Sequence, residues 1–137
     1  MNITFTVNER YLVIALAIGM LSAIGCNGDV AHVSGRVSRS DDAPLVGARV
    51  VARSDATGRS VEGLTDADGS YALTTVEIPN GMPAGEYKVT ILESRGRADS
   101  MRPATIASKY GNGDQSGLAF AVTEGEKKVF DIVVDPP

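Results

Sequence analysis

The chain has 137 residues, enough for one domain, and its 17 acidic and 13 basic side chains give a formal net charge of −4. The basic residues are scattered, so the sequence predicts no nucleic-acid partner, and the single cysteine excludes an intrachain disulfide or a metal site with several thiolates of this chain. Low aromatic content, the absence of tryptophan and 15 glycines favour short strands joined by turns over a helical bundle.

The N-terminal segment has the pattern of an export signal. Residues 11–24, YLVIALAIGMLSAI, form an unbroken run of 14 apolar or small residues. This run is too short to span about 30 Å of hydrocarbon comfortably. An apolar run of this length after a basic residue, Arg10, matches the central region of a secretory signal peptide.

The only cysteine follows this run almost directly. Ala23-Ile24-Gly25-Cys26 resembles the lipobox of bacterial lipoproteins. The resemblance implies that residues 1–25 are a lipoprotein signal peptide and that Cys26 is the lipid-modified first residue of the mature chain. Several acyl chains, at about 0.8 kcal/mol per buried CH₂, make a lasting membrane anchor. An ordinary cleaved signal that leaves a free cysteine and an uncleaved anchor are the alternatives.

Residues 26–30 leave a short linker between this anchor and the first predicted strand. At about 3.3–3.6 Å per residue, the linker places the domain within roughly 10–20 Å of the bilayer. Asn27 after the cysteine, rather than aspartate, favours the outer membrane under the enterobacterial sorting rule. The sequence therefore predicts an exported protein, anchored by lipid to the bacterial cell envelope at the outer membrane.

Residues 31–137 are predicted to form an all-β domain. Apolar and polar residues alternate in seven short segments separated by turn residues, and no segment of the domain shows a sustained apolar stripe of helical period. Seven short strands at this spacing indicate an antiparallel β-sandwich. The predicted strands are residues 31–38, 48–54, 59–65, 70–76, 86–93, 117–122 and 127–134.

A tight turn at Asp66-Ala67-Asp68-Gly69 is predicted to join the third and fourth strands as a hairpin. Aspartate at the head of a turn bonds the backbone ahead of it, and glycine at its close tolerates positive φ. Asp66 and Asp68 also have the first two spacings of a calcium loop, but the sixth position, which requires glycine, is Tyr71. The sequence therefore favours a turn over an ion site.

Residues 94–116 have no strong pattern and form the longest predicted loop. Loops beyond about 12–15 residues are uncommon in compact domains and are usually functional or disordered. The segment is locally basic on an acidic protein, which leaves two interpretations: a solvated loop pinned by its tyrosine, or a contact surface for an anionic or protein partner. The candidate contact residues are Arg95, Arg97, Arg102, Lys109 and Tyr110, against two acidic residues, Asp99 and Asp114.

Three segments together resemble a known domain family: VSGRVSRSDDAPLVGARVVA (33–52), GLTDADGSYAL (63–73) and PAGEYKVTI (83–91). Their pattern resembles the transthyretin-like, carboxypeptidase-regulatory-like β-sandwich domain. Three further features look like the small lipoproteins of this fold in planctomycete bacteria: Lys109-Tyr110, Ser116-Gly117-Leu118 and an ending with Phe130-Asp131-Ile132. The resemblance implies the fold over residues 31–134 but implies little about activity, because most members of the family are non-catalytic modules or uncharacterised.

The residue types show no convergent catalytic set. His32 is the only histidine, and the chain has no Gly-x-Ser-x-Gly nucleophile elbow. The leading hypothesis is a lipid-anchored, non-enzymatic envelope protein without a cofactor, whose sandwich is a binding or structural module for an envelope protein or a glycan. The alternative is a metal-binding protein or hydrolase in which carboxylates from the turns, Asp66, Asp68 and Asp114, converge at one end of the sandwich.

Overall fold

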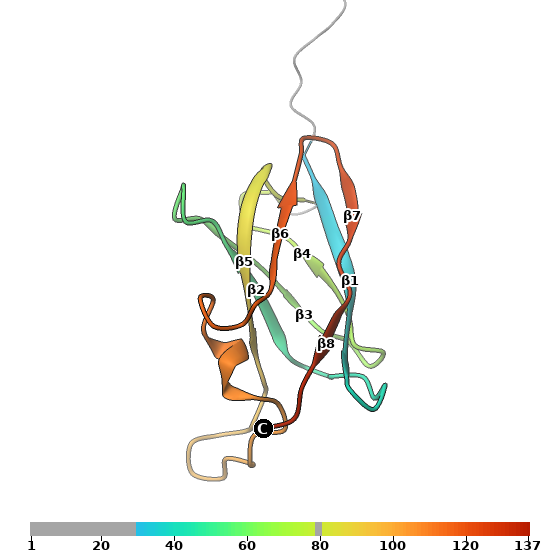
Figure 1. The fold of residues 1–137 in the computed structure, drawn as a ribbon, viewed down its shortest axis with the longest axis vertical. Coiled ribbons are helices and arrows are strands. Elements are labelled where there is room, and N and C mark those ends of the chain that lie inside the picture. The colour runs from blue at the N-terminus through green and yellow to red at the C-terminus, as the bar shows by residue number, and fades with distance from the viewer. Residues whose placement is uncertain (1–29, 79–80) are drawn as a thin grey trace, which may run out of the picture.

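The computed structural model describes residues 30–78 and 81–137, and the predicted signal peptide and Cys26 lie outside these ranges. Two β-sheets face each other around one core (Figure 1). Within the described ranges, no helix has the length and hydropathy that a membrane crossing requires.

The first sheet has the order β4 (Ser70–Leu73), β1 (His32–Arg39) and β7 (Lys127–Val129), and β8 (Ile132–Val134) also pairs with β1. The second sheet has the order β3 (Ser60–Leu64), β2 (Arg49–Arg53), β5 (Gly85–Leu92) and β6 (Ala119–Val122). A 3₁₀ turn, η2 (Ser108–Gly111), lies between β5 and β6 in the chain.

The predicted all-β fold is confirmed, and the alternation of residue types explains which side chains fill the core. On β2, Val50 and Ala52 are fully buried, while Arg49 and Arg53 are exposed. The strands β4, β5 and β6 repeat this alternation. Because the inward side chains of both sheets join one buried apolar cluster, the hydrophobic effect holds the two sheets face to face.

Two tyrosines, Tyr71 and Tyr87, point into the core, with 4% and 3% of their surface exposed. Each hydroxyl donates a hydrogen bond to a backbone carbonyl, that of Phe130 for Tyr71 and that of Pro83 for Tyr87. Burial, with a smaller contribution from the nearby charge of Asp131, raises the pKa of Tyr71. The Tyr71 hydroxyl therefore stays protonated and acts as a donor.

The expected antiparallel arrangement is wrong for two pairs of strands, those that β1 forms with β7 and with β8. β1 runs antiparallel to β4 but parallel to both β7 and β8. Alternating residues show which side chains face the core but not the direction of the neighbouring strand, because parallel and antiparallel strands share the period of two. The first and last strands of the domain therefore lie side by side and run in the same direction.

The predicted strand 127–134 is interrupted, so that it forms two short strands, β7 and β8. Both keep one register on β1 across a break at Phe130 and Asp131. At the break, the backbone N–H of Arg36 donates to Asp131 Oδ1 at 2.9 Å. A side-chain carboxylate thus takes the place of a ladder carbonyl, which keeps the donor of β1 satisfied.

The turn at Asp66–Gly69 is confirmed, but it connects the two sheets instead of forming a hairpin within one. The backbone N–H of Gly69 donates to the Asp66 carbonyl at 3.0 Å, and Asp66 Oδ1 accepts from the backbone N–H of Asp68 at 2.9 Å. β3 is an edge strand of one sheet and β4 an edge strand of the other. The turn therefore closes one side of the sandwich.

The two ends of the sandwich carry different parts of the chain. The described N-terminal end, at residue 30, lies at the top of Figure 1, while the C-terminus and the loop after β5 lie at the bottom. We call residues 94–107 the distal loop, because they lie at the end of the sandwich away from residue 30.

Candidate binding site

A hollow of about 150 Å³ lies at the base of the distal loop. Three arginines from two parts of the chain line it, Arg39 at the end of β1 and Arg95 and Arg102 in the loop. The wall also includes Glu93 and Thr105. We call this feature the arginine hollow.

Backbone carbonyls hold the three guanidinium groups in place. Arg95 Nε donates to the carbonyl of Arg102 at 2.8 Å, and Arg102 Nη2 donates to the carbonyl of Ser94 at 3.1 Å. Arg39 Nη1 reaches the carbonyl of Thr105 at 3.4 Å. Since a guanidinium has five N–H donors, each arginine retains further donors for a ligand.

None of these arginines is neutralised by a carboxylate in the described part of the chain. Among residues 30–78 and 81–137, no carboxylate oxygen lies within 4.0 Å of a guanidinium nitrogen of Arg39, Arg95 or Arg102. Glu93 also lines the hollow, where its carboxylate accepts from the Thr105 backbone N–H at 3.0 and 3.2 Å and from the Thr105 hydroxyl. With three guanidinium groups against this one carboxylate, the lining of the hollow carries net positive charge on an acidic protein.

A second hollow, of about 380 Å³, adjoins the first. Its wall is mainly apolar and includes Leu92, Met101 and Ile106. The Leu92 and Met101 side chains are 45% and 54% exposed, whereas Ile106 is buried in the core. Glu93 and Arg95 line both hollows, so the two share a wall. We call this feature the apolar hollow.

Two of the predicted contact residues, Lys109 and Tyr110, have a structural role in this fold. Tyr110 is 3% exposed, and its hydroxyl donates to Asp135 Oδ2 at 2.9 Å and accepts from the Asp135 backbone N–H at 3.0 Å. Lys109 Nζ lies 2.8 Å from Asp135 Oδ2 and 5.1 Å from the centre of the Tyr110 ring. These three residues tie η2 to the C-terminal segment after β8. Contact with a partner through Lys109 or Tyr110 stays a prediction.

The carboxylates of the alternative hypothesis do not converge. Asp66 is engaged by its own turn, and Asp114 Oδ1 lies 2.6 Å from Lys88 Nζ, which also contacts Asp55 at 2.7 Å. The ammonium of Lys88 lowers the pKa of Asp114, and both carboxylates raise that of Lys88. In residues 30–78 and 81–137, no group of three His, Cys, Asp or Glu side chains is placed to hold a metal ion.

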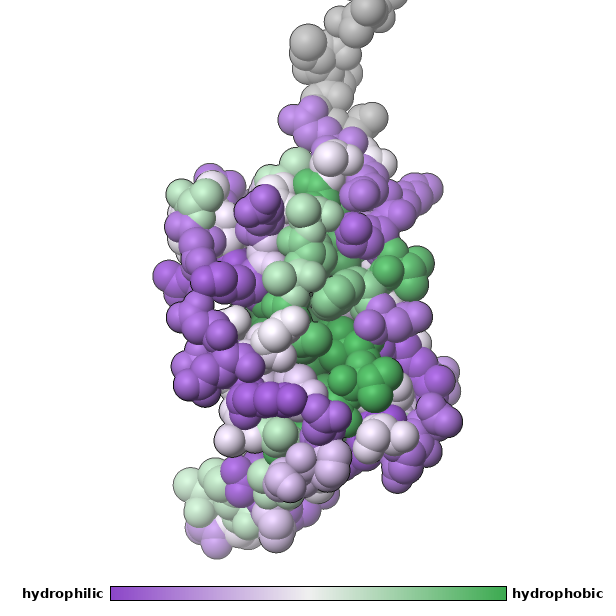
Figure 2. All heavy atoms as spheres, in the orientation of Figure 1, coloured by the Kyte–Doolittle hydropathy of each residue, from purple (hydrophilic) through white to green (hydrophobic). Residues whose placement is uncertain are grey.

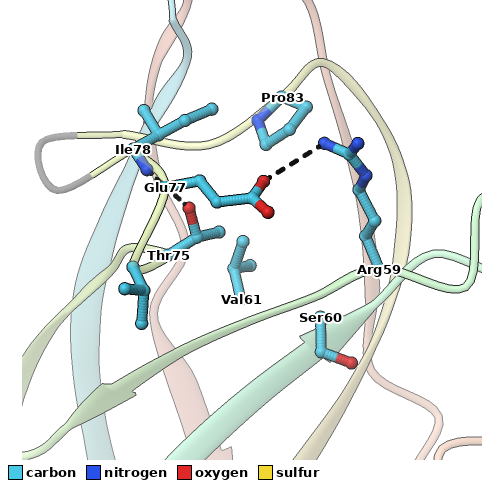
Figure 3. A pocket seen from close by; sticks show the side chains of 8 residues that line it. Arg59, Ser60, Val61, Thr75, Glu77, Ile78 and Pro83 are labelled. Carbon is cyan, nitrogen blue, oxygen red and sulfur yellow. Dashed lines mark hydrogen bonds and ion pairs between the residues drawn. The ribbon is translucent and has the colours of Figure 1, made fainter.

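A further hollow, of about 240 Å³, lies at the β3 edge of the sandwich (Figure 3). Arg59 and Glu77 face each other across it, with 3.6 Å between Nη1 and Oε2. Both side chains are mostly exposed, and exposed ion pairs contribute little to stability. Here the guanidinium already has a carboxylate neighbour, so this hollow is a weaker anion site than the arginine hollow.

Apolar side chains also gather on the face seen in Figure 2, over β6, β7 and β8. Val129 on β7 and Val133 on β8 are 72% and 59% exposed. Charged Lys127 and Asp131 alternate with them along this part of the chain. Single exposed valines separated by charged residues are normal on a protein surface, so these valines are not our candidate site.

A sequence model of the carboxypeptidase regulatory-like domain matches residues 32–134. The chain belongs to this family. The match covers every strand from β1 to β8, so the candidate site is part of the domain itself. No curated protein matches the chain.

Solved structures with the fold of this carboxypeptidase regulatory-like domain include the TIE protein of Bacillus anthracis, at a TM-score of 0.51 and 18% identity. Another is BcpA, the major pilin subunit of Bacillus cereus, at a TM-score of 0.55 and 13% identity. The chain is covered to 79% and 80%, but it spans only 17% and 31% of those two proteins. Similarity at this level of identity shows the fold, which is compatible with a non-catalytic module.

Sequence reasoning found the two loop arginines of the candidate site but missed Arg39. Arg95 and Arg102 stand out because they lie in a long segment without strand pattern. Arg39 ends β1 and reads as an ordinary outward residue of a strand. Only the packing of the distal loop against β1 brings it to the hollow, and the spacing of residues in the chain carries no signal for that contact.

Replacing Asp135 with asparagine should remove a pH-dependent part of the stability of the carboxypeptidase regulatory-like domain. Lys109 and the Tyr110 hydroxyl lower the pKa of Asp135 in the folded chain. Its stabilising contribution is therefore complete above the ordinary pKa of about 4 and is lost as the pH falls through the lowered value. We expect the melting temperature of the wild type to exceed that of Asp135→Asn at pH 6 and to approach it below about pH 3.

Asp99→Asn is the matched control for this experiment. Asp99 is exposed, and no basic nitrogen of the described residues lies within 4.0 Å of its carboxylate. A melting-temperature difference for Asp135→Asn that stays constant between pH 6 and pH 3 would contradict the proposed role of the ion pair.

Proposed function

We propose that the chain is a non-enzymatic protein of the bacterial cell envelope, anchored by lipid on Cys26, and that its carboxypeptidase regulatory-like domain binds a partner protein through the distal loop. The arginine hollow carries this proposal. It combines three guanidinium groups, positioned by backbone carbonyls and without a carboxylate partner in the described chain. Net charge of one sign next to exposed apolar surface is typical of a binding site.

The positions of the two ends of the sandwich support an orientation in which the distal loop points away from the membrane. The described domain begins at residue 30, at the end of the sandwich opposite the distal loop (Figure 1). With lipid on Cys26 and a linker of residues 26–30, the end near residue 30 lies within roughly 10–20 Å of the bilayer. The distal loop then points away from the membrane of attachment, where an envelope partner can reach it.

A partner protein agrees with the site better than a neutral glycan does. Sugar rings commonly stack on exposed aromatic side chains, and Tyr110, the aromatic residue nearest the distal loop in the chain, is only 3% exposed. The distal loop together with the flanking Arg39 and Glu93 instead holds four arginines against two acidic residues. They are Arg39, Arg95, Arg97 and Arg102 against Glu93 and Asp99.

Replacing Cys26 with serine tests the anchor. Serine cannot form the thioether to lipid, so we expect the wild type, and not the variant, to incorporate radiolabelled palmitate when the full chain is expressed in a Gram-negative bacterium. Immunoprecipitation and autoradiography measure the label. Equal labelling of the two chains, or no labelling of the wild type, contradicts the lipid anchor on Cys26.

Crosslinking in intact cells, followed by capture of the full chain from detergent extracts, tests the binding role. We expect a crosslinked partner that the double variant Arg95→Ala, Arg102→Ala no longer captures. The matched control is Arg49→Ala, Arg53→Ala, which removes two exposed arginines from the outward face of β2. Equal loss of partner in both double variants would mean that overall charge, and not the arginine hollow, determines the interaction.

A further inference from the structure

We infer that the arginine hollow and the apolar hollow form one composite site for an extended protein segment that places a carboxylate side chain beside an apolar side chain. This inference rests on the proposed function and adds the chemistry of the partner. The two hollows share the wall made by Glu93 and Arg95, so one short segment can occupy both.

The size and chemistry of the arginine hollow fit a single anionic group. Its volume of about 150 Å³ leaves room for a carboxylate together with water. Guanidinium groups bind carboxylates through two parallel N–H···O bonds. Arg39 and Arg95 are half-buried and therefore partly ordered before binding. A preorganised donor set loses less side-chain entropy when its ligand arrives.

The apolar hollow fits one aliphatic side chain of the same segment. Its volume is about 380 Å³, and the exposed parts of Leu92 and Met101 gain from being covered. Methionine is unbranched and adapts its shape to different apolar partners. Successive side chains of an extended segment point to opposite faces, so residues two apart, with Cα atoms about 6.6 Å from each other, present their side chains to the same surface and suit two hollows with a common wall.

The charge of the distal loop favours an acidic segment there. The chain as a whole carries a net charge of −4, whereas the distal loop holds Arg95, Arg97 and Arg102 against one acidic residue, Asp99. Opposite charges steer an encounter to the complementary patch. A small free anion would use the arginine hollow and leave the apolar hollow empty, whereas an acidic and apolar segment uses both.

The test uses the full chain, isotope-labelled and solubilised in detergent, with binding followed by NMR chemical shifts. The probe is the blocked peptide acetyl-Ser-Asp-Ser-Leu-Ser-amide, in which the aspartate and the leucine are two residues apart and share one face of an extended segment. The comparison probes replace its aspartate with asparagine or its leucine with serine, and inorganic phosphate serves as a free anion. We expect shifts confined to the distal loop and its neighbours, and affinity at least about tenfold lower for each altered peptide.

Protein variants separate the two parts of the site. The double variant Arg95→Ala, Arg102→Ala should lower the affinity for the acidic peptide and for phosphate alike, by about tenfold or more. Met101→Ser should lower the affinity for the peptide and leave the affinity for phosphate unchanged. Arg102 also stabilises the loop through its hydrogen bond to the Ser94 carbonyl, so Arg39→Ala serves as a second variant of the anion site. The contact of Arg39 with the Thr105 carbonyl is longer, at 3.4 Å. We expect Arg39→Ala to weaken the binding of the acidic peptide and of phosphate in the same way.

Three results overturn the inference. They are equal binding of the aspartate and asparagine peptides, loss of phosphate binding in Met101→Ser, and no shift with the acidic peptide at millimolar concentration. The proposed function is judged separately. If the acidic peptide does not bind but a cellular partner is captured through Arg95 and Arg102, the proposed function stands and only the inference about the partner's chemistry is overturned. If neither experiment gives the expected result, both conclusions are overturned.

Discussion

Replacing Gly69 with valine is expected to lower the free energy of unfolding by about 3–5 kcal/mol. Gly69 closes the turn between β3 and β4 with φ at +79°, a conformation that costs other residues about 1–2 kcal/mol and β-branched residues more. A Cβ atom there would also lie 2.5 Å from the Val37 carbonyl oxygen. We expect thermal unfolding, followed by circular dichroism, to show a melting temperature lower by more than about 12 °C.

The matched control for Gly69→Val is Gly58→Val. Gly58 has a similar φ of +71°, but no atom lies within 4 Å of the position its Cβ would take. Both variants therefore have the cost of a positive φ, and the difference between their losses in free energy of unfolding measures the clash with the Val37 backbone. We expect Gly58→Val to lose only about 1–2 kcal/mol. Equal losses in the two variants would show that close packing of the turn on β1 does not contribute.

Replacing Gly35 with alanine is expected to lower the free energy of unfolding by about 3 kcal/mol. A Cβ atom at Gly35 would overlap the Phe130 carbonyl oxygen and would lie 2.6 Å from its carbon. The Phe130 carbonyl would have to move and would lose the hydrogen bond from the Tyr71 hydroxyl. Since this carbonyl sits at the break between β7 and β8, the pairing of the first and last strands is disturbed. Urea unfolding measures the loss.

Gly113→Ala is the control for Gly35→Ala, because the nearest atom to its Cβ position is Lys88 Cβ at an ordinary 3.6 Å. Its expected effect is within about 0.5 kcal/mol. A double-mutant cycle with Tyr71→Phe then tests the mechanism. If Gly35→Ala already displaces the Phe130 carbonyl, removing the Tyr71 hydroxyl should cost less in that background than alone. Strict additivity of the two changes contradicts the mechanism.

The sequence predicted the loop part of the candidate site but not the residue that β1 contributes to it. A long segment without strand pattern, rich in arginine on an acidic chain, is unusual, and it drew attention to Arg95 and Arg102. The role of Tyr110 as an anchor was one of two interpretations, and its burial agrees with the structural one. Its partner Asp135 lies 25 residues away, and the sequence holds no sign that the two residues meet.

The fold was predicted to a greater extent than the site. Alternation of apolar and polar residues depends on local geometry, because successive side chains of any strand point to opposite faces. The strand positions and the inward faces, including Val50, Ala52, Tyr87 and Val89, were therefore readable directly. The same alternation occurs in parallel and antiparallel pairs, so the sequence did not predict that β7 and β8 run parallel to β1.

The sequence by itself determined that residues 31–137 form a β-sandwich, with a tight turn at Asp66–Gly69 and a long basic loop after the strand ending near residue 92. These features depend on residues close together in the chain. Only the tertiary structure decided that β3 and β4 lie in different sheets, that the first and last strands run parallel, and that Arg39 joins the loop arginines around one hollow. Each of these depends on contacts between residues far apart in the sequence, which become adjacent only when the two sheets pack on a common core.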